Sequence, residues 1–124
     1  MARILVIEDE APIRENLLRF LRLEGHDVVA AENGRIGLEM AAAHSPELIF
    51  CDVMMPEMNG VAVLDAIRND AVLAETCFIF LTASADAEDV QRGLNRGANE
   101  YVTKPFNLKD LRAVIARHLG ESKA

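Results

Sequence analysis

Apolar residues recur along the chain in two spacings, which predict strands that alternate with helices. Five short apolar runs are bounded by turn signals, a pattern typical of strands buried on both faces of a parallel sheet. The runs are Arg3–Ile7, Asp27–Ala31, the run from Leu48 into Asp52, Cys77–Leu81 closing at Thr82, and Glu100–Thr103.

Between these runs, apolar residues recur at helical spacing, which predicts five helices. The first helix begins near Pro12, which suits a first helical turn, and it stops at Gly25. Its arginines, Arg14 among them, are expected to face water. The second helix is capped by Asn33, and the third follows Asn59-Gly60. The fourth helix covers about Asp86–Arg96 and contains Gly93, which weakens it. The last helix runs from about Leu108 to Leu119.

The inner faces of these helices are predicted from the same spacing. The residues expected to point inward are Ile13, Leu17, Leu21, Ile36, Met40, Val61, Leu64, Ile67, Val90, Leu94, Leu108, Leu111, Ile115 and Leu119. Five repeats of strand and helix require an α/β sandwich with a mostly parallel sheet. The right-handed crossover rule places helices on both faces of that sheet.

Length and composition narrow the class of protein. A chain of 124 residues is one domain with room for a real core. Its net charge of −7 argues against a nucleic-acid surface. No apolar run approaches the roughly 20 residues that cross a membrane, and the N-terminus lacks a secretion signal. Cys51 and Cys77 fall in predicted buried strands and are interpreted as core residues rather than a disulfide or metal pair, which suits a reducing cytoplasm.

The residues that follow the strands carry the candidate chemistry. The first strand leads into Glu8 and Asp9, the third ends at Asp52, and Thr82 and Lys104 follow the fourth and fifth. Because parallel strands end on the same side, these side chains can converge on one rim. Three carboxylates held together raise one another's pKa unless a cation joins them, and oxygen ligands with room for water favour Mg²⁺. A metal, a lysine and a hydroxyl can neutralise a phosphoryl group, which an aspartate can accept covalently.

From about Ile4 to Leu119 the chain resembles a response-regulator receiver domain of two-component signalling. The matching residues are Glu8-Asp9, Asp52 with Met55-Pro56 and Asn59-Gly60, Thr82-Ala83, and Lys104-Pro105-Phe106. In this order and spacing they are highly specific. The resemblance implies a flavodoxin-like doubly wound fold, with five parallel strands in the order 2-1-3-4-5 and five helices. It also implies that residues 1–124 form a single receiver domain.

The resemblance assigns a role to each matching position. Asp52 would accept a phosphoryl group from a phosphohistidine. Asp9 and Asp52 would ligate Mg²⁺ together with the backbone carbonyl of Met54, and Glu8 would act through a bound water. Glu8 stands where many members of the family carry aspartate, and it is a common alternative.

Three further positions concern the phosphoryl group and its effects. Lys104 would pair with the phosphoryl oxygens, and Thr82 would hydrogen-bond to them. Tyr101 stands at the position of the family's switch aromatic, where the alternative is that it only packs. The resemblance also implies a cis peptide bond between Lys104 and Pro105.

The function that the resemblance implies is a cytoplasmic switch activated by phosphorylation. The donor would be a sensor histidine kinase or a histidine phosphotransfer protein, and the change would appear on the surface formed by the fourth helix, fifth strand and fifth helix. The downstream protein is unknown, and a homodimer that forms on phosphorylation is a further expected partner. This domain is expected to bind neither nucleic acid nor a membrane. It is not expected to be an enzyme, apart from self-phosphorylation from small donors and self-dephosphorylation.

Three other functions compete with this interpretation. A flavin-phosphate module needs a glycine- and hydroxyl-rich loop after the first strand, and the acidic stretch from Glu8 to Pro12 is its electrostatic opposite. A phosphatase with an aspartyl nucleophile needs a second acid two residues later, where this chain has Met54. A receiver that only binds a partner would be distinguished by a failure of Asp52 to become phosphorylated. The sequence leaves open whether the chain acts alone or belongs to a longer regulator.

Overall fold

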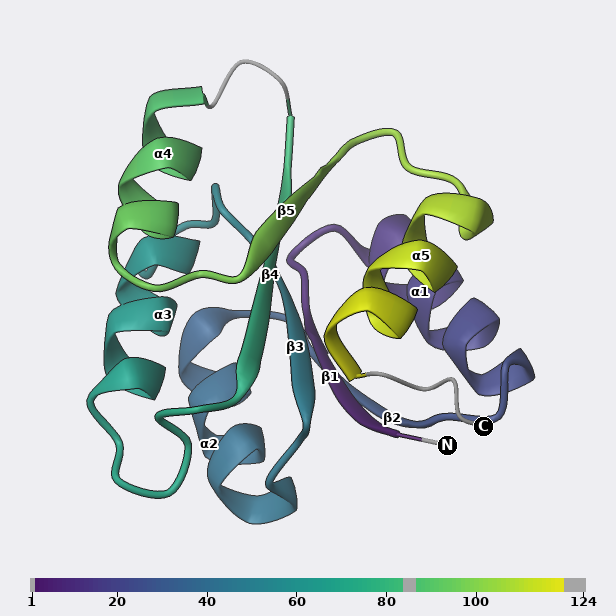
Figure 1. The fold of residues 1–124 in the computed structure, drawn as a ribbon, viewed down its shortest axis with the longest axis horizontal. Helices are drawn as coiled ribbons and strands as arrows, with labels where there is room; N and C mark the ends of the chain where they lie inside the picture. Colours follow the sequence, from purple (N-terminus) through teal and green to yellow (C-terminus); the bar gives the residue numbers. More distant parts are fainter. Residues whose placement is uncertain (1, 84–86, 120–124) are drawn as a thin grey trace.

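A five-stranded parallel sheet forms the centre of the protein (Figure 1). The structure is a computed structural model and describes residues 2–83 and 87–119. The strand order is β2-β1-β3-β4-β5, as predicted. In chain order the elements are β1 (Arg3–Ile7), α1 (Ala11–Leu23), β2 (Asp27–Ala31), α2 (Gly34–His44), β3 (Leu48–Asp52), α3 (Gly60–Arg68), β4 (Cys77–Thr82), α4 (Ala87–Asn95), β5 (Glu100–Thr103) and α5 (Leu108–Leu119).

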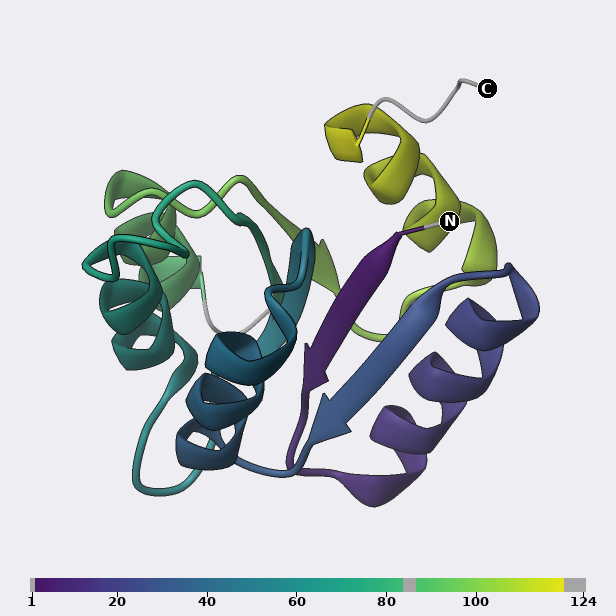
Figure 2. The same cartoon turned by 90° about the horizontal axis from the view of Figure 1, so that it is seen from below.

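Helices cover both faces of the sheet, so the core has two halves. Helices α1 and α5 lie on one face, and α2, α3 and α4 lie on the other (Figures 1 and 2). Successive strand residues alternate between the halves: Phe50 packs on the side of α1 and α5, whereas Ile49 packs on the side of α2 to α4. Every residue of β3 and β4 is buried, which explains why these strands appear in the sequence as continuous apolar runs.

The predicted helix starts are confirmed by their caps. The side-chain oxygen of Asn33 accepts a hydrogen bond from the backbone N–H of Ile36 at 2.8 Å, and that of Asn59 accepts one from Ala62 at 2.9 Å. Each asparagine therefore satisfies one N–H group that the first turn of its helix leaves unpaired. Helix α4 is described from Ala87, and the predicted start at Asp86 lies outside the described residues.

Gly93 has a packing role that its effect on helix propensity does not reveal. A Cβ atom at this position would lie 2.0 Å from Cε2 of the Phe80 ring. The absence of a side chain therefore lets α4 lie directly against β4.

The two cysteines lie on opposite faces of the sheet. Cys51 packs on the side of α2 to α4, Cys77 on the side of α1 and α5, and both are free thiols. Burial raises the pKa of Cys77 to about 11, and burial with the nearby charges of Asp52 and Glu8 raises the pKa of Cys51 well above its usual value. The prediction that they are core residues is confirmed.

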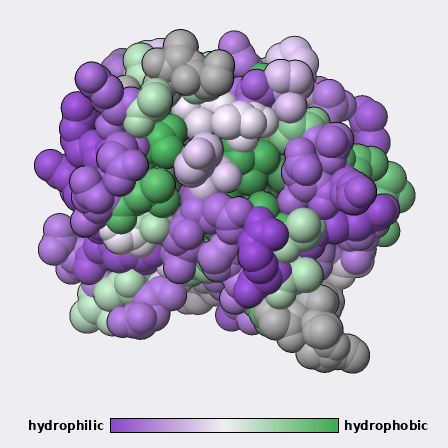
Figure 3. Space-filling model, turned by 45° about the horizontal axis from the view of Figure 1, so that its top comes forward, coloured by the Kyte–Doolittle hydropathy of each residue, from purple (hydrophilic) through white to green (hydrophobic). Residues whose placement is uncertain are grey.

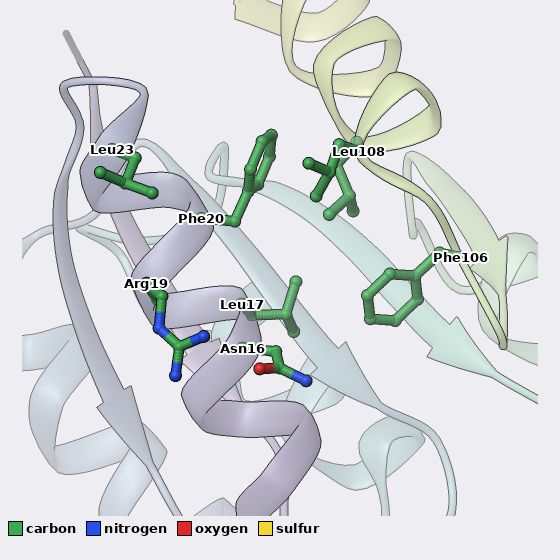
Figure 4. Close-up of a pocket in the computed structure, with 8 residues that line it drawn as sticks. Asn16, Leu17, Arg19, Phe20, Leu23, Phe106 and Leu108 are labelled. Carbon is green, nitrogen blue, oxygen red and sulfur yellow. The ribbon is translucent and has the colours of Figure 1, made fainter.

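The prediction that Leu108 points inward is wrong. Its side chain is 49% exposed and lines an open groove of about 380 Å³ between α1 and α5, together with Phe20 and Phe106 (Figure 4). The inner face of α5 is formed instead by Leu111, Val114 and Ile115. Helical spacing places Leu108 on the correct side of α5, but it does not say that the neighbouring helix stands too far away to cover it.

None of the helices in the described part of the chain is both long and apolar enough to cross a membrane.

Candidate functional site

The sheet register brings the predicted site residues to one edge. Ile7, the last residue of β1, pairs with Cys51, so Glu8 follows β1 next to Asp52, the last residue of β3. On the next strands Thr82 pairs with Thr103, which precedes Lys104. Figure 3 turns this edge toward the viewer, and its surface is mainly hydrophilic with a few hydrophobic side chains in the middle.

Three of these side chains are buried, which is unusual for their types. Glu8 is 0% exposed, Thr82 1% and Asp52 5%, and they are the buried polar side chains within the described residues. Asp9 is more exposed, and the Lys104 side chain is 18% exposed. Carboxylates are almost never fully buried unless they are paired, so this burial makes these residues the candidate functional site.

The three carboxylates form a tight cluster beside one ammonium group. One oxygen from each of Glu8, Asp9 and Asp52 lies within 4.8 Å of the others. The Nζ atom of Lys104 lies 3.1 Å from Oε1 of Glu8 and 3.3 Å from Oδ2 of Asp52. One ammonium group thus faces three carboxyl groups, and the cluster would carry an excess of negative charge if all three were ionised.

The pKa of Asp52 reflects this imbalance. Burial is the largest cause that raises it, and the charge of Glu8 adds to the effect. Lys104 acts in the opposite direction, yet the pKa of Asp52 still rises from 3.8 to about 8. For Lys104, burial lowers the pKa, but hydrogen bonding and attraction to Glu8 and Asp52 outweigh it, so the pKa of this ammonium is raised.

The oxygen atoms of this cluster are suitable ligands for a hard divalent cation. Oε1 of Glu8 is fully buried, and its partner among the described residues is the ammonium of Lys104, which forms an ion pair with it at 3.1 Å. The backbone carbonyl of Met54 also accepts no hydrogen bond from the part of the chain that the structure describes. Carboxylate and carbonyl oxygens without nitrogen or sulfur donors are the ligands that Mg²⁺ and Ca²⁺ prefer.

Thr82, Lys104 and Tyr101 are arranged along β4 and β5. The Thr82 hydroxyl donates to the carbonyl of Ala83 at 2.9 Å. The backbone N–H of Lys104 donates to the carbonyl of Thr82 at 2.7 Å, and the Lys104–Pro105 peptide bond is cis. Tyr101 is 43% exposed and does not reach into the core.

Arg14 belongs to the support of the site, although the sequence pattern predicts that it faces water. Its Nη1 atom donates to the backbone carbonyl of Glu8 at 2.9 Å, and its side chain is partly buried. It thereby fixes the loop that carries the acidic pair. No motif in the sequence signals this contact, because only the turn from β1 into α1 brings the two residues together.

A sequence profile described as "Response regulator receiver domain" matches residues 4–116. Among curated proteins, the chain is 38% identical over 119 residues to the response regulator ArlR of Staphylococcus saprophyticus, covering 93% of this chain and 51% of that protein. It is 39% identical over 113 residues to the phosphate regulon transcriptional regulatory protein PhoB of Klebsiella pneumoniae, covering 91% and 49%. The chain therefore spans about half the length of these relatives.

Solved structures share the same fold. The chemotaxis protein CheY4 of Vibrio cholerae superimposes with a TM-score of 0.90 at 31% identity, over 95% of this chain and 98% of that one. Because the profile covers nearly all of the sequence and the structural likeness is equally broad, this chain belongs to the response regulator receiver domain family.

Proposed function

We propose that this protein accepts a phosphoryl group on Asp52 from a histidine kinase or a histidine phosphotransfer protein, in a reaction that requires Mg²⁺. Membership of the family supports signalling in a two-component system. The observation that carries the finer proposal is the buried cluster of Glu8, Asp9 and Asp52 with Lys104 beside it.

The carboxylate of Asp52 is the proposed nucleophile. Asp9, Asp52 and the Met54 carbonyl would hold Mg²⁺, with Glu8 acting through a bound water. The ion would supply positive charge for the transferring phosphoryl oxygens. An Asp52 oxygen forms a bond to phosphorus while the bond between phosphorus and the histidine nitrogen breaks, and the imidazole leaves with the electron pair of that bond.

Lys104 and Thr82 hold the product. The ammonium of Lys104, already 3.3 Å from an Asp52 oxygen, would move its ion pair to the phosphoryl oxygens. The buried hydroxyl of Thr82 would turn from the Ala83 carbonyl to donate to a phosphoryl oxygen. The chain then acts as a switch that self-phosphorylates from small donors and self-dephosphorylates, without turnover of another substrate.

The output would appear on the surface formed by α4, β5 and α5. Tyr101 on β5 is partly exposed, so its ring can turn inward when Thr82 moves. That surface would then bind a downstream protein or a second copy of the chain. We place this switch in the cytoplasm, where free thiols such as Cys51 and Cys77 stay reduced. It would form one receiver domain over residues 1–124 without membrane contacts, and its net charge of −7 argues against nucleic-acid contacts of its own.

Measuring the mass of the intact protein tests whether Asp52 is the phosphoacceptor. Incubated with Mg²⁺ and acetyl phosphate, the protein should gain one phosphoryl group, and Asp52→Asn should gain none. Asp27→Asn is the matched control, because Asp27 begins β2 at the opposite edge of the sheet, and it should be labelled like the parent. Full labelling of Asp52→Asn would place the acceptor elsewhere.

Mg²⁺ should raise the thermal midpoint, because it binds the native cluster and relieves the repulsion among its carboxylates. Asp9→Ala should blunt the rise by removing a ligand, measured by thermal unfolding over a Mg²⁺ series. An equal rise in Asp9→Ala would show that the ion binds at another place.

Without metal, the contribution of Asp52 to the stability of the parent should fall as pH rises from about 4 to about 8. In this range the folded protein keeps a proton on Asp52 that the unfolded chain has lost, because the folded pKa is about 8 and the ordinary value is 3.8. Asp52→Asn removes this effect. The difference in free energy of unfolding between Asp52→Asn and the parent should therefore be smallest near pH 4 and should grow in favour of the variant up to about pH 8. Urea unfolding in EDTA measures both proteins, and a difference that does not change with pH would contradict the assignment.

The role of Thr82 can be measured through Tyr101, since the chain has one tyrosine and no tryptophan. Beryllofluoride with Mg²⁺ should change the tyrosine emission of the parent, and Thr82→Ala should bind the mimic yet show a much smaller change. Thr103→Ala alters the exposed strand partner of Thr82 and should respond like the parent. Equal responses in Thr82→Ala and the parent would mean that the signal leaves Asp52 by another route.

A further inference from the structure

Gly60, the first residue of α3, lies against the backbone of the proposed phosphoacceptor. A Cβ atom there would be 2.4 Å from the Asp52 carbonyl oxygen and 3.0 Å from Cα of Val53. Both contacts are with backbone, which cannot rotate away as a flexible side chain can. The backbone angles of Gly60 are open to any residue, unlike those of Gly25, whose φ is +90°. The position therefore requires glycine for space and not for conformation.

From this contact we propose that Gly60 is a positioning residue for the cation side of the site. Its missing side chain lets α3 begin close to Asp52. This closeness would hold the loop of residues 53–59, which carries the Met54 carbonyl two residues after Asp52. The inference rests on the proposed function, because it assigns the Mg²⁺ ligands as that function does.

Hydrogen bonds close the loop at the same point. The N–H of Gly60 donates to the carbonyl of Val53 at 2.8 Å, so the two ends of the loop meet at Gly60. The Asn59 side chain caps α3 through Ala62 and fixes the first helical turn beside this closure. The Val53 carbonyl is thereby occupied, whereas the next carbonyl, that of Met54, has no hydrogen-bond donor among the described residues and remains available to a cation.

The loop does not hold this shape through local preference alone. Glu57 has a φ of 68°, a left-handed conformation that is unfavourable for a residue with a side chain. A short hydrogen bond from the N–H of Met58 to the Pro56 carbonyl at 2.7 Å spans Glu57, and the closure at Gly60 and Asn59 holds the two ends of the same loop. An alanine at position 60 would push α3 away from Asp52 and open the loop, which would move the Met54 carbonyl relative to Asp9 and Asp52.

The test compares two glycines, neither of which leaves room for a Cβ atom. Titration calorimetry of Mg²⁺ into the metal-free protein gives Kd, and thermal unfolding gives the midpoint. Gly60→Ala should weaken Mg²⁺ binding by about 10-fold or more, as expected when a support of metal ligands is lost. Gly93→Ala would place its Cβ 2.0 Å from the Phe80 ring, away from the loop, so its midpoint should fall while Kd stays within about twofold of the parent. A Kd for Gly60→Ala within about twofold of the parent would overturn the inference.

If Gly60→Ala does not fold, substitutions at two helix caps provide a second test of the inference. Asn59 and Asn33 make the same cap contact, at 2.9 and 2.8 Å, but only Asn59 is itself a residue of the loop. Asn59→Ala should weaken Mg²⁺ binding several-fold, and Asn33→Ala should leave it unchanged; equal Kd values would overturn the inference. If the parent protein binds no Mg²⁺, the proposed function and this inference are overturned together. If the parent binds Mg²⁺ and the variants have the same Kd, only the inference is overturned.

Discussion

The buried repulsion between Glu8 and Asp52 is the constraint on which the rest of the site depends. Both carboxylates lie within the sheet edge at 0% and 5% exposure, and Lys104 is the ammonium that reaches both. Burying one charge is costly, and burying two of the same sign beside each other is more so. The fold is stable enough to hold this cluster because β3 and β4 bury every residue between two layers of helices.

Parallel topology explains why the cluster forms where it does. The faces of the sheet are covered by helices, so the ends of the strands are where side chains can meet both the core and water. A carboxylate at a strand end is rigidly placed by the ladder behind it. Asp52 is the last residue of β3 and pairs with Leu81 of β4, and it therefore differs from an acid carried on a loop. The same rigidity makes the cluster unable to relax by moving apart, and only a proton, a cation or Lys104 can relieve it.

The sequence was enough to predict the strands, their order by resemblance, and the convergence of Glu8, Asp52 and Lys104. These follow from apolar runs and from the fact that parallel strands end together. It was not enough for Leu108 or Arg14. The exposure of Leu108 depends on the space between two helices far apart in the chain, and the contact of Arg14 depends on how tightly β1 turns into α1. Spacing within one helix carries no information about either distance. Gly93 shows the same limit, because a residue that weakens a helix in isolation is the one that lets it approach Phe80.

The arrangement of β4 and β5 joins the chemistry to the surface. Thr82 and Lys104 belong to the site, and Tyr101 belongs to the outer surface, yet all three lie on this strand pair. The Lys104 N–H donates to the Thr82 carbonyl at 2.7 Å, and Thr103 pairs with Thr82 in the ladder. A change in the position of Thr82 must therefore either break these bonds or carry β5 with it. Since unpaired backbone groups inside a sheet are costly, movement of the two strands together is the favoured response. In the proposed function, a displacement of the Thr82 backbone that accompanies the turn of its hydroxyl would therefore reach Tyr101 through this hydrogen-bonded strand pair.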